Sequence, residues 1–407
     1  MSRPHTHHSS VRLRARAVPA RRSAGPWLVG LAAGVLACTG AFLVPTGPAP
    51  AAPVPLAAHA AAPAPVDDRL PDCAAVVAAM SPRALLAQRL MVGVDAADPA
   101  AAAETVRTSQ VGGVFLPGNA TALLRDQALR ALQAGARLPV TVAVDDEGGR
   151  VQRIDELDGD LPSARAMSGM TTDEVRALAV ARGRALAARG VTQDIAPVVD
   201  LGGQSAREVI GDRSFGTDPN DVTRYALAFA EGLREAGIEP VVKHFPGHGR
   251  ADGDSHAGRV TTPPLDELRS ADLRPYADLV GPGAPLATGP LPAAVMVGHL
   301  DVPGLTDGLP SSLTPAVYAL LRDEYGFAGV VYTDDLGAMK AVTGQYELPE
   351  AVLAALDAGA DVALWSAGGD PDPILDALEP ALAAGTLDAG ENTAAVTRVL
   401  RSKSVCG

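Results

Sequence analysis

Residues 243–256 read Lys-His-Phe-Pro-Gly-His-Gly-Arg-Ala-Asp-Gly-Asp-Ser-His and follow the apolar pair Val241 and Val242. The stretch gathers one lysine, three histidines and two aspartates in a chain whose only other lysines are Lys340 and Lys403. Its glycines, at positions 247, 249 and 253, permit backbone angles that other residues avoid. The pattern predicts a strand that ends in polar side chains and opens into a mobile loop, a frequent setting for catalytic residues.

Outward from this stretch, from about residue 70 onward, short apolar runs alternate with helical patterns such as 172–189, 220–236 and 314–325. Alternating strands and helices are typical of parallel sheets in α/β proteins. Eight such units are the number in a (β/α)8 barrel, which we expect here as a single catalytic domain over residues 67–407. An open, doubly wound sheet is the alternative, although no G-x-G-x-x-G motif follows a strand. The candidate strands are 89–94, 111–116, 140–144, 194–199, 241–244, 294–299, 330–333 and 362–366.

Polar residues follow or close five of the eight apolar runs. In a barrel, functional side chains lie at the carboxyl ends of the strands, so these residues are expected to meet at one face. They are residues 145–150, Asp200, Lys243 with His244, residues 298–299, and Asp334 with Asp335.

The last of these groups, and the loop that follows Lys243 and His244, carry the residue types of nucleophilic and acid–base chemistry. A carboxylate such as Asp334 can attack an anomeric carbon, bind a metal or cap the next helix, and we assign chemistry to Asp334 and support to Asp335. In the loop, Asp254 can accept a hydrogen bond from one nitrogen of His256 and leave the other free to move a proton. An incidental polar surface loop is the alternative for this pair.

Five further residues are candidates for a polar ring that holds sugar hydroxyls and an acyl group: Asp145, Arg153, Arg213, Lys243 and His244. Ion pairing of these residues only with one another is the alternative. The histidines at 244, 248 and 256 fit no standard zinc spacing, and a lysine at 243 would repel a cation. We therefore expect neither a metal nor a cofactor.

The first 44 residues are expected to direct export. Six arginines and no acidic residue precede an apolar run of eighteen residues, 27–44. A basic segment followed by an apolar one is typical of signals that export the part of the chain that follows. Three interpretations remain open: a lipoprotein signal with Cys38 as the lipidated residue, an uncleaved membrane anchor, or a signal cleaved after residues 58–60. Residues 45–66, rich in proline and alanine, predict a linker.

Charge and cysteines restrict the setting further. Removing the six N-terminal arginines leaves 28 basic against 47 acidic residues, an acidic body that argues against a nucleic-acid partner. The remaining cysteines, Cys73 and Cys406, lie near the two ends of the folded part. A closed barrel brings its first and last elements together, so we expect them to form a disulfide in an oxidising compartment; two unpaired buried thiols are the alternative.

Four motifs, taken together, resemble glycoside hydrolase family 3, in particular its bacterial β-N-acetylhexosaminidases. The motifs are residues 243–249 with Asp-Ser-His at 254–256, residues 144–153, Gly-Asp-Arg-Ser-Phe at 211–215, and Thr-Asp-Asp-Leu at 333–336. The resemblance covers roughly residues 75–400. Thr333 and Gly337 depart from the residues usual in the family, and neither carries the mechanism.

The resemblance implies a retaining mechanism in which Asp334 is the nucleophile and His256 the general acid/base, with Asp254 as its partner. It also implies that Asp145, Arg153, Arg213, Lys243 and His244 bind N-acetylglucosamine. Many glucosidase relatives take a carboxylate acid from a second domain, for which the sequence after the eighth strand is too short. An imidazole, which titrates near pH 6.5, can give and then take a proton.

We therefore expect an exported, envelope-associated and monomeric exo-β-N-acetylglucosaminidase that acts on peptidoglycan fragments, the muropeptides. The alternatives are a β-glucosidase or β-xylosidase of the same fold, and a phosphorylase, because an imidazole base tolerates an anionic acceptor better than a carboxylate would. An alternative of another class is a non-catalytic, sugar-binding envelope lipoprotein.

Overall fold

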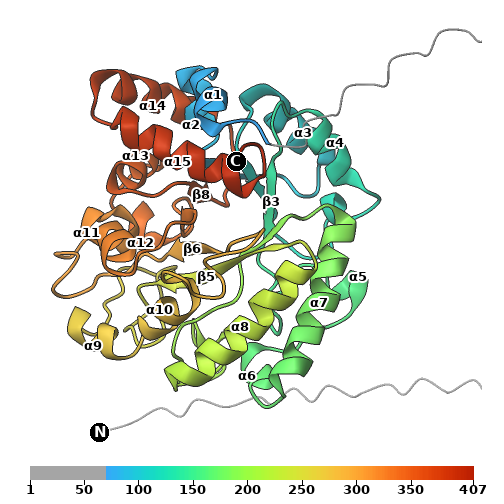
Figure 1. Ribbon diagram of the computed structural model, residues 1–407, viewed down its shortest axis with the longest axis vertical. Coiled ribbons are helices and arrows are strands. Elements are labelled where there is room, and N and C mark those ends of the chain that lie inside the picture. The colour runs from blue at the N-terminus through green and yellow to red at the C-terminus, as the bar shows by residue number, and fades with distance from the viewer. Residues whose placement is uncertain (1–69) are drawn as a thin grey trace, which may run out of the picture. The chain divides into compact units, whose positions relative to one another are not determined.

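The computed structural model describes residues 70–407, and the (β/α)8 barrel expected from the sequence is confirmed (Figure 1). Each of the eight strands overlaps its expected range. The strands are β1 (Leu90–Gly93), β2 (Gly113–Phe115), β3 (Thr141–Val144), β4 (Gln193–Asp194), β5 (Glu239–Phe245), β6 (Ala294–Val297), β7 (Val331–Thr333) and β8 (Ala363–Trp365).

Neighbouring strands pair in parallel throughout, in the order β7-β6-β5-β4-β3-β2-β1-β8. A parallel bridge between Tyr332 and Val362 joins the two ends of this series. The Thr333 N–H also donates to the Val362 carbonyl at 3.0 Å. The sheet therefore closes on itself, and all carboxyl ends of the strands point to the same mouth.

Every residue of the eight strands is buried, as expected for parallel strands covered on both faces. One apolar cluster fills the barrel, with Met91, Phe115, Met296, Tyr332 and Leu364 among its members. A larger cluster lies between the strands and the helices. The barrel is thus a packed core that positions its polar strand ends.

The helices begin and end at residues that the sequence marks clearly. The long α7 starts with a capping box, in which Thr171 and Glu174 bond to each other's backbone, and ends at the left-handed Gly190. The helices are α1 (Cys73–Ala78), α2 (Pro82–Ala87), α3 (Pro99–Ser109), α4 (Ala128–Ala134), α5 (Asp155–Asp158), α6 (Ala164–Met167), α7 (Thr172–Arg189), α8 (Pro219–Glu235), α9 (Leu265–Ser270), α10 (Arg274–Val280), α11 (Pro315–Ala319), α12 (Lys340–Thr343), α13 (Leu348–Ala358), α14 (Asp372–Ala384) and α15 (Ala389–Ser402).

Two elements differ from the expectation. The fourth strand is regular only at Gln193–Asp194, because Pro197 has no N–H to donate to the ladder. The chain nevertheless continues along β5, where the Val199 N–H donates to the Lys243 carbonyl at 2.7 Å. The helix expected over 314–325 divides into α11 and a π-helical turn at Leu320–Glu324.

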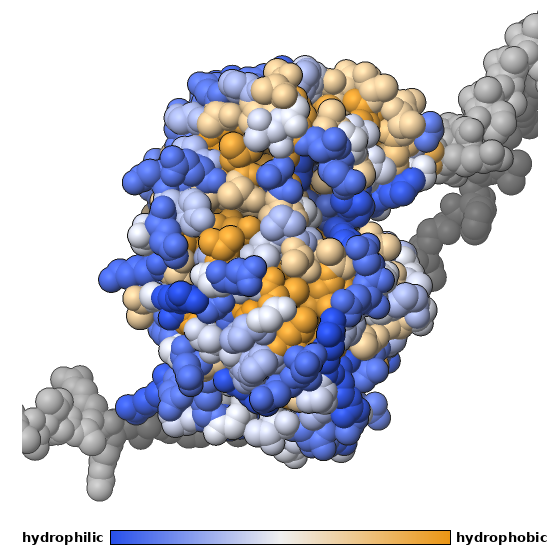
Figure 2. All heavy atoms as spheres, turned by 90° about the vertical axis from the view of Figure 1, so that its left-hand side faces the viewer, coloured by the Kyte–Doolittle hydropathy of each residue, from blue (hydrophilic) through white to orange (hydrophobic). Residues whose placement is uncertain are grey.

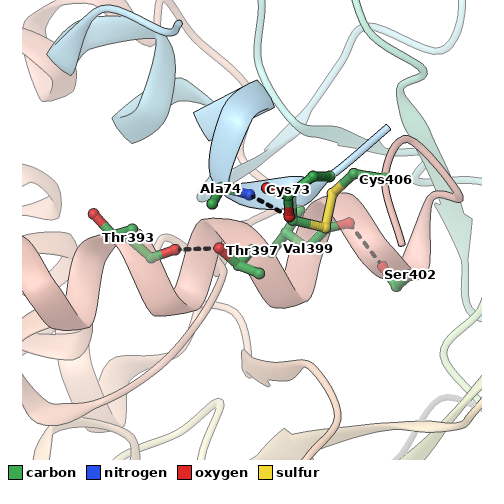
Figure 3. The surroundings of a disulfide bond; sticks show 8 residues. Cys73, Ala74, Thr393, Thr397, Val399, Ser402 and Cys406 are labelled. Atoms are coloured by element: carbon green, nitrogen blue, oxygen red, sulfur yellow. Dashed lines mark hydrogen bonds between the residues drawn. A yellow bond between two sulfur atoms is a disulfide. The ribbon is translucent and has the colours of Figure 1, made fainter. Parts of the chain in front are cut away.

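The first and last helices of the described chain lie side by side, and a disulfide joins them (Figures 1 and 3). Cys73 opens α1 and Cys406 follows α15, and the two are bonded across 333 residues of sequence. Both cysteines are buried in a small apolar cluster with Val77, Val396 and Leu400. The structure thus forms the pairing that the barrel's closure led us to expect.

Loss of this disulfide is expected to destabilise the fold. Replacing both Cys73 and Cys406 with serine should lower the free energy of unfolding by about 2–4 kcal/mol, because the unfolded chain loses a cross-link over a long loop. Urea unfolding of the wild type with and without reductant, beside the double variant, measures this. Reductant should leave the double variant unchanged, and an unchanged wild-type midpoint would contradict the prediction.

On the face shown in Figure 2, hydrophilic side chains lie between the hydrophobic areas. Among residues 70–407, the exposed large hydrophobic residues are Leu70 and Leu309. No helix within this range has the length and apolar character needed to cross a membrane. The predicted export segment (1–44), Cys38 and the linker (45–66) lie outside the described residues.

Candidate active site

A pocket of about 650 Å³ opens at the carboxyl ends of the strands. Its walls come from the segments after β3, β4, β7 and β8 and from β5 with the loop that follows it. The structure brings all eight predicted catalytic and substrate-binding residues into this lining: Asp145, Arg153, Arg213, Lys243, His244, Asp254, His256 and Asp334.

Asp334 follows β7 directly and is 7% exposed. Its Oδ1 accepts the N–H of Asp335 at 2.8 Å, and no donor in residues 70–407 reaches its Oδ2. Burial alone would raise the pKa of this carboxyl, but the imidazoles of His244 and His299, together with the Asp335 N–H, bring the pKa below its ordinary value. Asp334 is therefore an ionised carboxylate at the mouth, with one oxygen free to attack.

Asp335 has the contacts of a supporting residue. Its Oδ1 accepts the N–H groups of Gly337 at 2.9 Å, Ala338 at 3.1 Å and Ser366 at 3.1 Å, while its Oδ2 accepts the Ser366 hydroxyl. Because these donors come from the segments after β7 and β8, the second carboxylate fixes the backbone that presents Asp334.

Asp254 and His256 form a hydrogen-bonded pair on the loop after β5. Asp254 Oδ1 lies 2.8 Å from Nδ1 of His256 and also accepts the His256 N–H at 2.9 Å. Burial raises the pKa of Asp254, but these two hydrogen bonds outweigh it and lower the pKa overall. No partner in the described chain binds Nε2 of His256, so this nitrogen is free to exchange a proton with a ligand.

Ser255, between them, anchors the loop. Its hydroxyl lies 3.4 Å from Nε2 of His248 and 3.6 Å from the Met339 sulfur, and its carbonyl accepts the Ala341 N–H at 3.1 Å.

Two glycines of the same loop have different structural roles. A Cβ at Gly249 would lie 1.9 Å from the Leu201 carbonyl, so this glycine permits close packing. Gly253 has φ +104°, and a Cβ there would make ordinary contacts with Val260 Cγ2 at 3.8 Å and the Arg259 carbonyl at 4.0 Å.

Lys243 and Arg213 share one buried carboxylate, Glu147. Lys243 Nζ lies 2.6 Å from Glu147 Oε1, and Arg213 donates to both Glu147 oxygens at 2.7 and 2.8 Å. Lys243 also donates to Asp145 at 2.7 Å, and Arg153 lies 3.7 Å from Asp145. Burial lowers the pKa of Lys243, but these carboxylates outweigh it and raise the pKa overall. The ring therefore carries alternating charges at the pocket wall.

His244 is oriented by a second buried carboxylate, Asp200. Its Nδ1 lies 2.7 Å from Asp200 Oδ2, and the other Asp200 oxygen accepts the His248 N–H at 2.6 Å. His244 lines the pocket, and no hydrogen-bond partner in residues 70–407 binds its Nε2. The imidazoles of His244, His248 and His256 thus each have a different side-chain partner: Asp200, Ser255 and Asp254, respectively.

Sequence reasoning identified Asp200 only as a strand-end residue and gave Glu147 no separate role. Both act by holding a ligand-binding candidate, through contacts that span 44 to 96 residues. A signal was present in the run Asp145-Asp146-Glu147, since three successive acids after a buried strand need cationic or N–H partners. Asp146 indeed accepts the N–H groups of Arg153 at 2.7 Å and Ile154 at 3.3 Å.

Comparison with known proteins agrees with this geometry. A family model described as the glycosyl hydrolase family 3 N terminal domain matches residues 83–402. A protein named beta-hexosaminidase LpqI, from Mycobacterium tuberculosis, is 46% identical over 367 residues, which are 88% of this chain and 90% of that protein.

Solved structures give the same result. The structure of M. tuberculosis LpqI is 47% identical, covers 82% of this chain and 97% of its own, and superposes with a TM-score of 0.77. A beta-N-acetylhexosaminidase from Beutenbergia cavernae is 30% identical, covers 80% of this chain and 98% of its own, and has a TM-score of 0.70.

Proposed function

Because this chain belongs to glycosyl hydrolase family 3, we propose that it is a retaining exo-β-N-acetylglucosaminidase that removes terminal β-linked N-acetylglucosamine from peptidoglycan fragments. One observation carries the proposal: an ionised Asp334 with a free oxygen and an Asp254–His256 pair with a free Nε2 line the same pocket. These are the nucleophile and the proton carrier that retention requires.

In the first step, an oxygen of Asp334 attacks the anomeric carbon from the face opposite the leaving group. The glycosidic bond breaks, and the protonated His256 gives its proton to the departing oxygen. In the second step, water attacks the same carbon while neutral His256 takes its proton, and Asp334 is released. Two inversions restore the β configuration.

The residues around the pocket wall hold the sugar that is cleaved. Lys243, Arg213 and Arg153 are donors, whereas Asp145 offers carboxylate oxygens, so hydroxyls find both kinds of partner. Glu147 fixes Arg213 and Lys243, and Asp200 fixes His244, before substrate arrives. A pocket prepared in this way favours a chemical role over mere sugar retention.

The N-terminal sequence supports a location outside the cytoplasm, at the cell envelope. Residues 1–44 direct export, through lipidation of Cys38, an uncleaved anchor or a cleaved signal, and with either kind of anchor residues 45–66 are the linker between the membrane and the barrel domain (67–407). The enzyme acts there as a monomer, without a cofactor.

The test is product analysis by mass spectrometry and NMR. The expected result is cleavage of aryl β-N-acetylglucosaminide much faster than of aryl β-glucoside or β-xyloside, with β-N-acetylglucosamine as the first anomer. Faster cleavage of the glucoside, or the α anomer first, would contradict the proposal. Parallel reactions in phosphate buffer test a second candidate function, phosphorolysis, whose product is N-acetylglucosamine 1-phosphate. This candidate is considered because the imidazole of His256 tolerates an anionic acceptor better than a carboxylate base would.

A further inference from the structure

A second hollow of about 690 Å³, which we call the side groove, adjoins the active-site pocket. Its walls are two loops, residues 203–209 between β4 and α8, and residues 249–254 between β5 and α9. Arg207, Val209 and Asp254 line both the side groove and the pocket itself. The two spaces therefore meet at these three residues.

The junction lies where a leaving group must pass. His256 protonates the glycosidic oxygen in the proposed mechanism, so the part of the substrate beyond that oxygen, the aglycone, extends past the Asp254–His256 pair. Asp254 belongs to the rim of the side groove as well as to this pair. An aglycone bound to the pocket is thus directed toward the side groove.

The side groove is held together by specific hydrogen bonds. Gln204 donates from Nε2 to the Gly249 carbonyl at 3.0 Å and so ties one loop to the other. Arg150 donates to the carbonyls of Glu208 at 2.6 Å, Val209 at 3.0 Å and Ile210 at 3.2 Å, which fixes the backbone after Arg207. The loops thus present their side chains in a defined arrangement.

Arg207 differs from the other arginines of the two cavities. Arg150, Arg153, Arg213 and Arg250 each pair with an aspartate or glutamate. Arg207 is exposed, and no carboxylate of residues 70–407 lies within ion-pair distance of it. An unpaired guanidinium at a cavity junction is suited to a carboxylate on a ligand, which it can bind through two parallel hydrogen bonds.

The acidic residues of the side groove limit where that carboxylate can lie. Glu208, Asp252 and Asp254 also line the groove and would repel an anion placed among them. Arg207 alone of the groove residues combines an unpaired positive charge with a place at the junction. The favourable position for a negative group is therefore on the first unit of the aglycone, next to the bond that is cleaved.

We propose that the side groove is the aglycone subsite and that Arg207 selects aglycones that carry a carboxylate close to the cleaved bond. The inference rests on the proposed function, since it takes the pocket to hold the terminal sugar. Two sources share this chemistry: an ether-linked acid on the aglycone sugar, as in N-acetylmuramic acid, and a carboxylate of a peptide attached to that sugar.

The test compares kcat/KM of the wild type and Arg207→Gln on four β-N-acetylglucosaminides. Their aglycones are an aryl group, neutral N-acetylglucosamine, N-acetylmuramic acid, and N-acetylmuramic acid amidated by a peptide. We expect about a tenfold or larger loss on at least one carboxylate-bearing substrate and less than about a twofold change on the aryl and neutral ones. Arg401→Gln, at an exposed arginine of α15 outside both cavities, is the matched control and should change none of the four.

Each outcome decides the proposal. Loss only on the free acid, or only on the peptide-bearing substrate, supports it and identifies the source of the carboxylate. Equal loss on the neutral disaccharide overturns it, because Arg207 would then contact hydroxyls, and no loss on any substrate overturns it as well. Wild-type inactivity on the aryl N-acetylglucosaminide would overturn the proposed function itself, whereas activity there without an Arg207 effect would overturn the subsite alone.

Discussion

Replacing Asp334 with alanine is expected to lower kcat/KM for aryl β-N-acetylglucosaminide by about 10⁴-fold or more, because no covalent intermediate can form. Nothing else in the pocket substitutes for it readily. Asp335, the adjacent carboxylate, is occupied by the N–H groups of Gly337, Ala338 and Ser366. The measurement is a steady-state assay of purified protein whose fold is checked by circular dichroism.

Azide supplies a direct check of the role of Asp334. In the alanine variant a small anion can enter the space of the lost carboxylate, attack from the same face and leave an α-glycosyl azide. Asp357→Ala, at an exposed aspartate of α13, is the matched control and should retain full activity. Wild-type activity in the Asp334 variant would exclude Asp334 as the nucleophile.

Replacing His256 with alanine is expected to slow cleavage of a disaccharide by about 10²–10⁴-fold, the usual contribution of general acid–base catalysis. The loss should depend on the leaving group. A dinitrophenolate leaves without a proton, so its release should remain fast, while attack by water on the intermediate stays slow for lack of a base. A burst of dinitrophenolate followed by a slow phase is the expected trace.

The same variant has a second diagnostic reaction. Azide needs no base, so it should attack the glycosyl-enzyme directly, shorten the slow phase and yield a β-glycosyl azide, the opposite anomer from that of the Asp334 variant. Equal losses for disaccharide and dinitrophenyl substrate, without azide rescue, would assign His256 to binding rather than to proton transfer.

The fold was readily predictable because its signal is local. A buried parallel strand reads as an unbroken apolar run, and eight such runs separated by helical patterns leave few alternatives to a closed barrel. The exception is the fourth strand, which stops at Asp194, since Pro197 interrupts the ladder in a way that apolar content does not reveal.

For the candidate site, the sequence predicted which residues take part but not how they contact one another. Strand ends indicate which residues reach the mouth, so Asp145, Lys243 and Asp334 could be assigned to one face. The sequence does not indicate which residues are paired. That Glu147 holds Arg213 and Lys243 together depends on three segments separated by 66 and 96 residues. The lack of an ion-pair partner at Arg207 was equally unpredictable, because a charge can be recognised as unpaired only when the positions of its neighbours are known.

The disulfide between Cys73 and Cys406 has a consequence for proteolysis of the folded chain. It turns nearly the whole described chain into a covalent ring. One backbone cleavage between these two positions opens the ring but frees no fragment, so the nicked molecule keeps all of its strands and the residues at its mouth. Two cleavages are needed before any segment can diffuse away, which makes the loops around the pocket tolerant of a single cut.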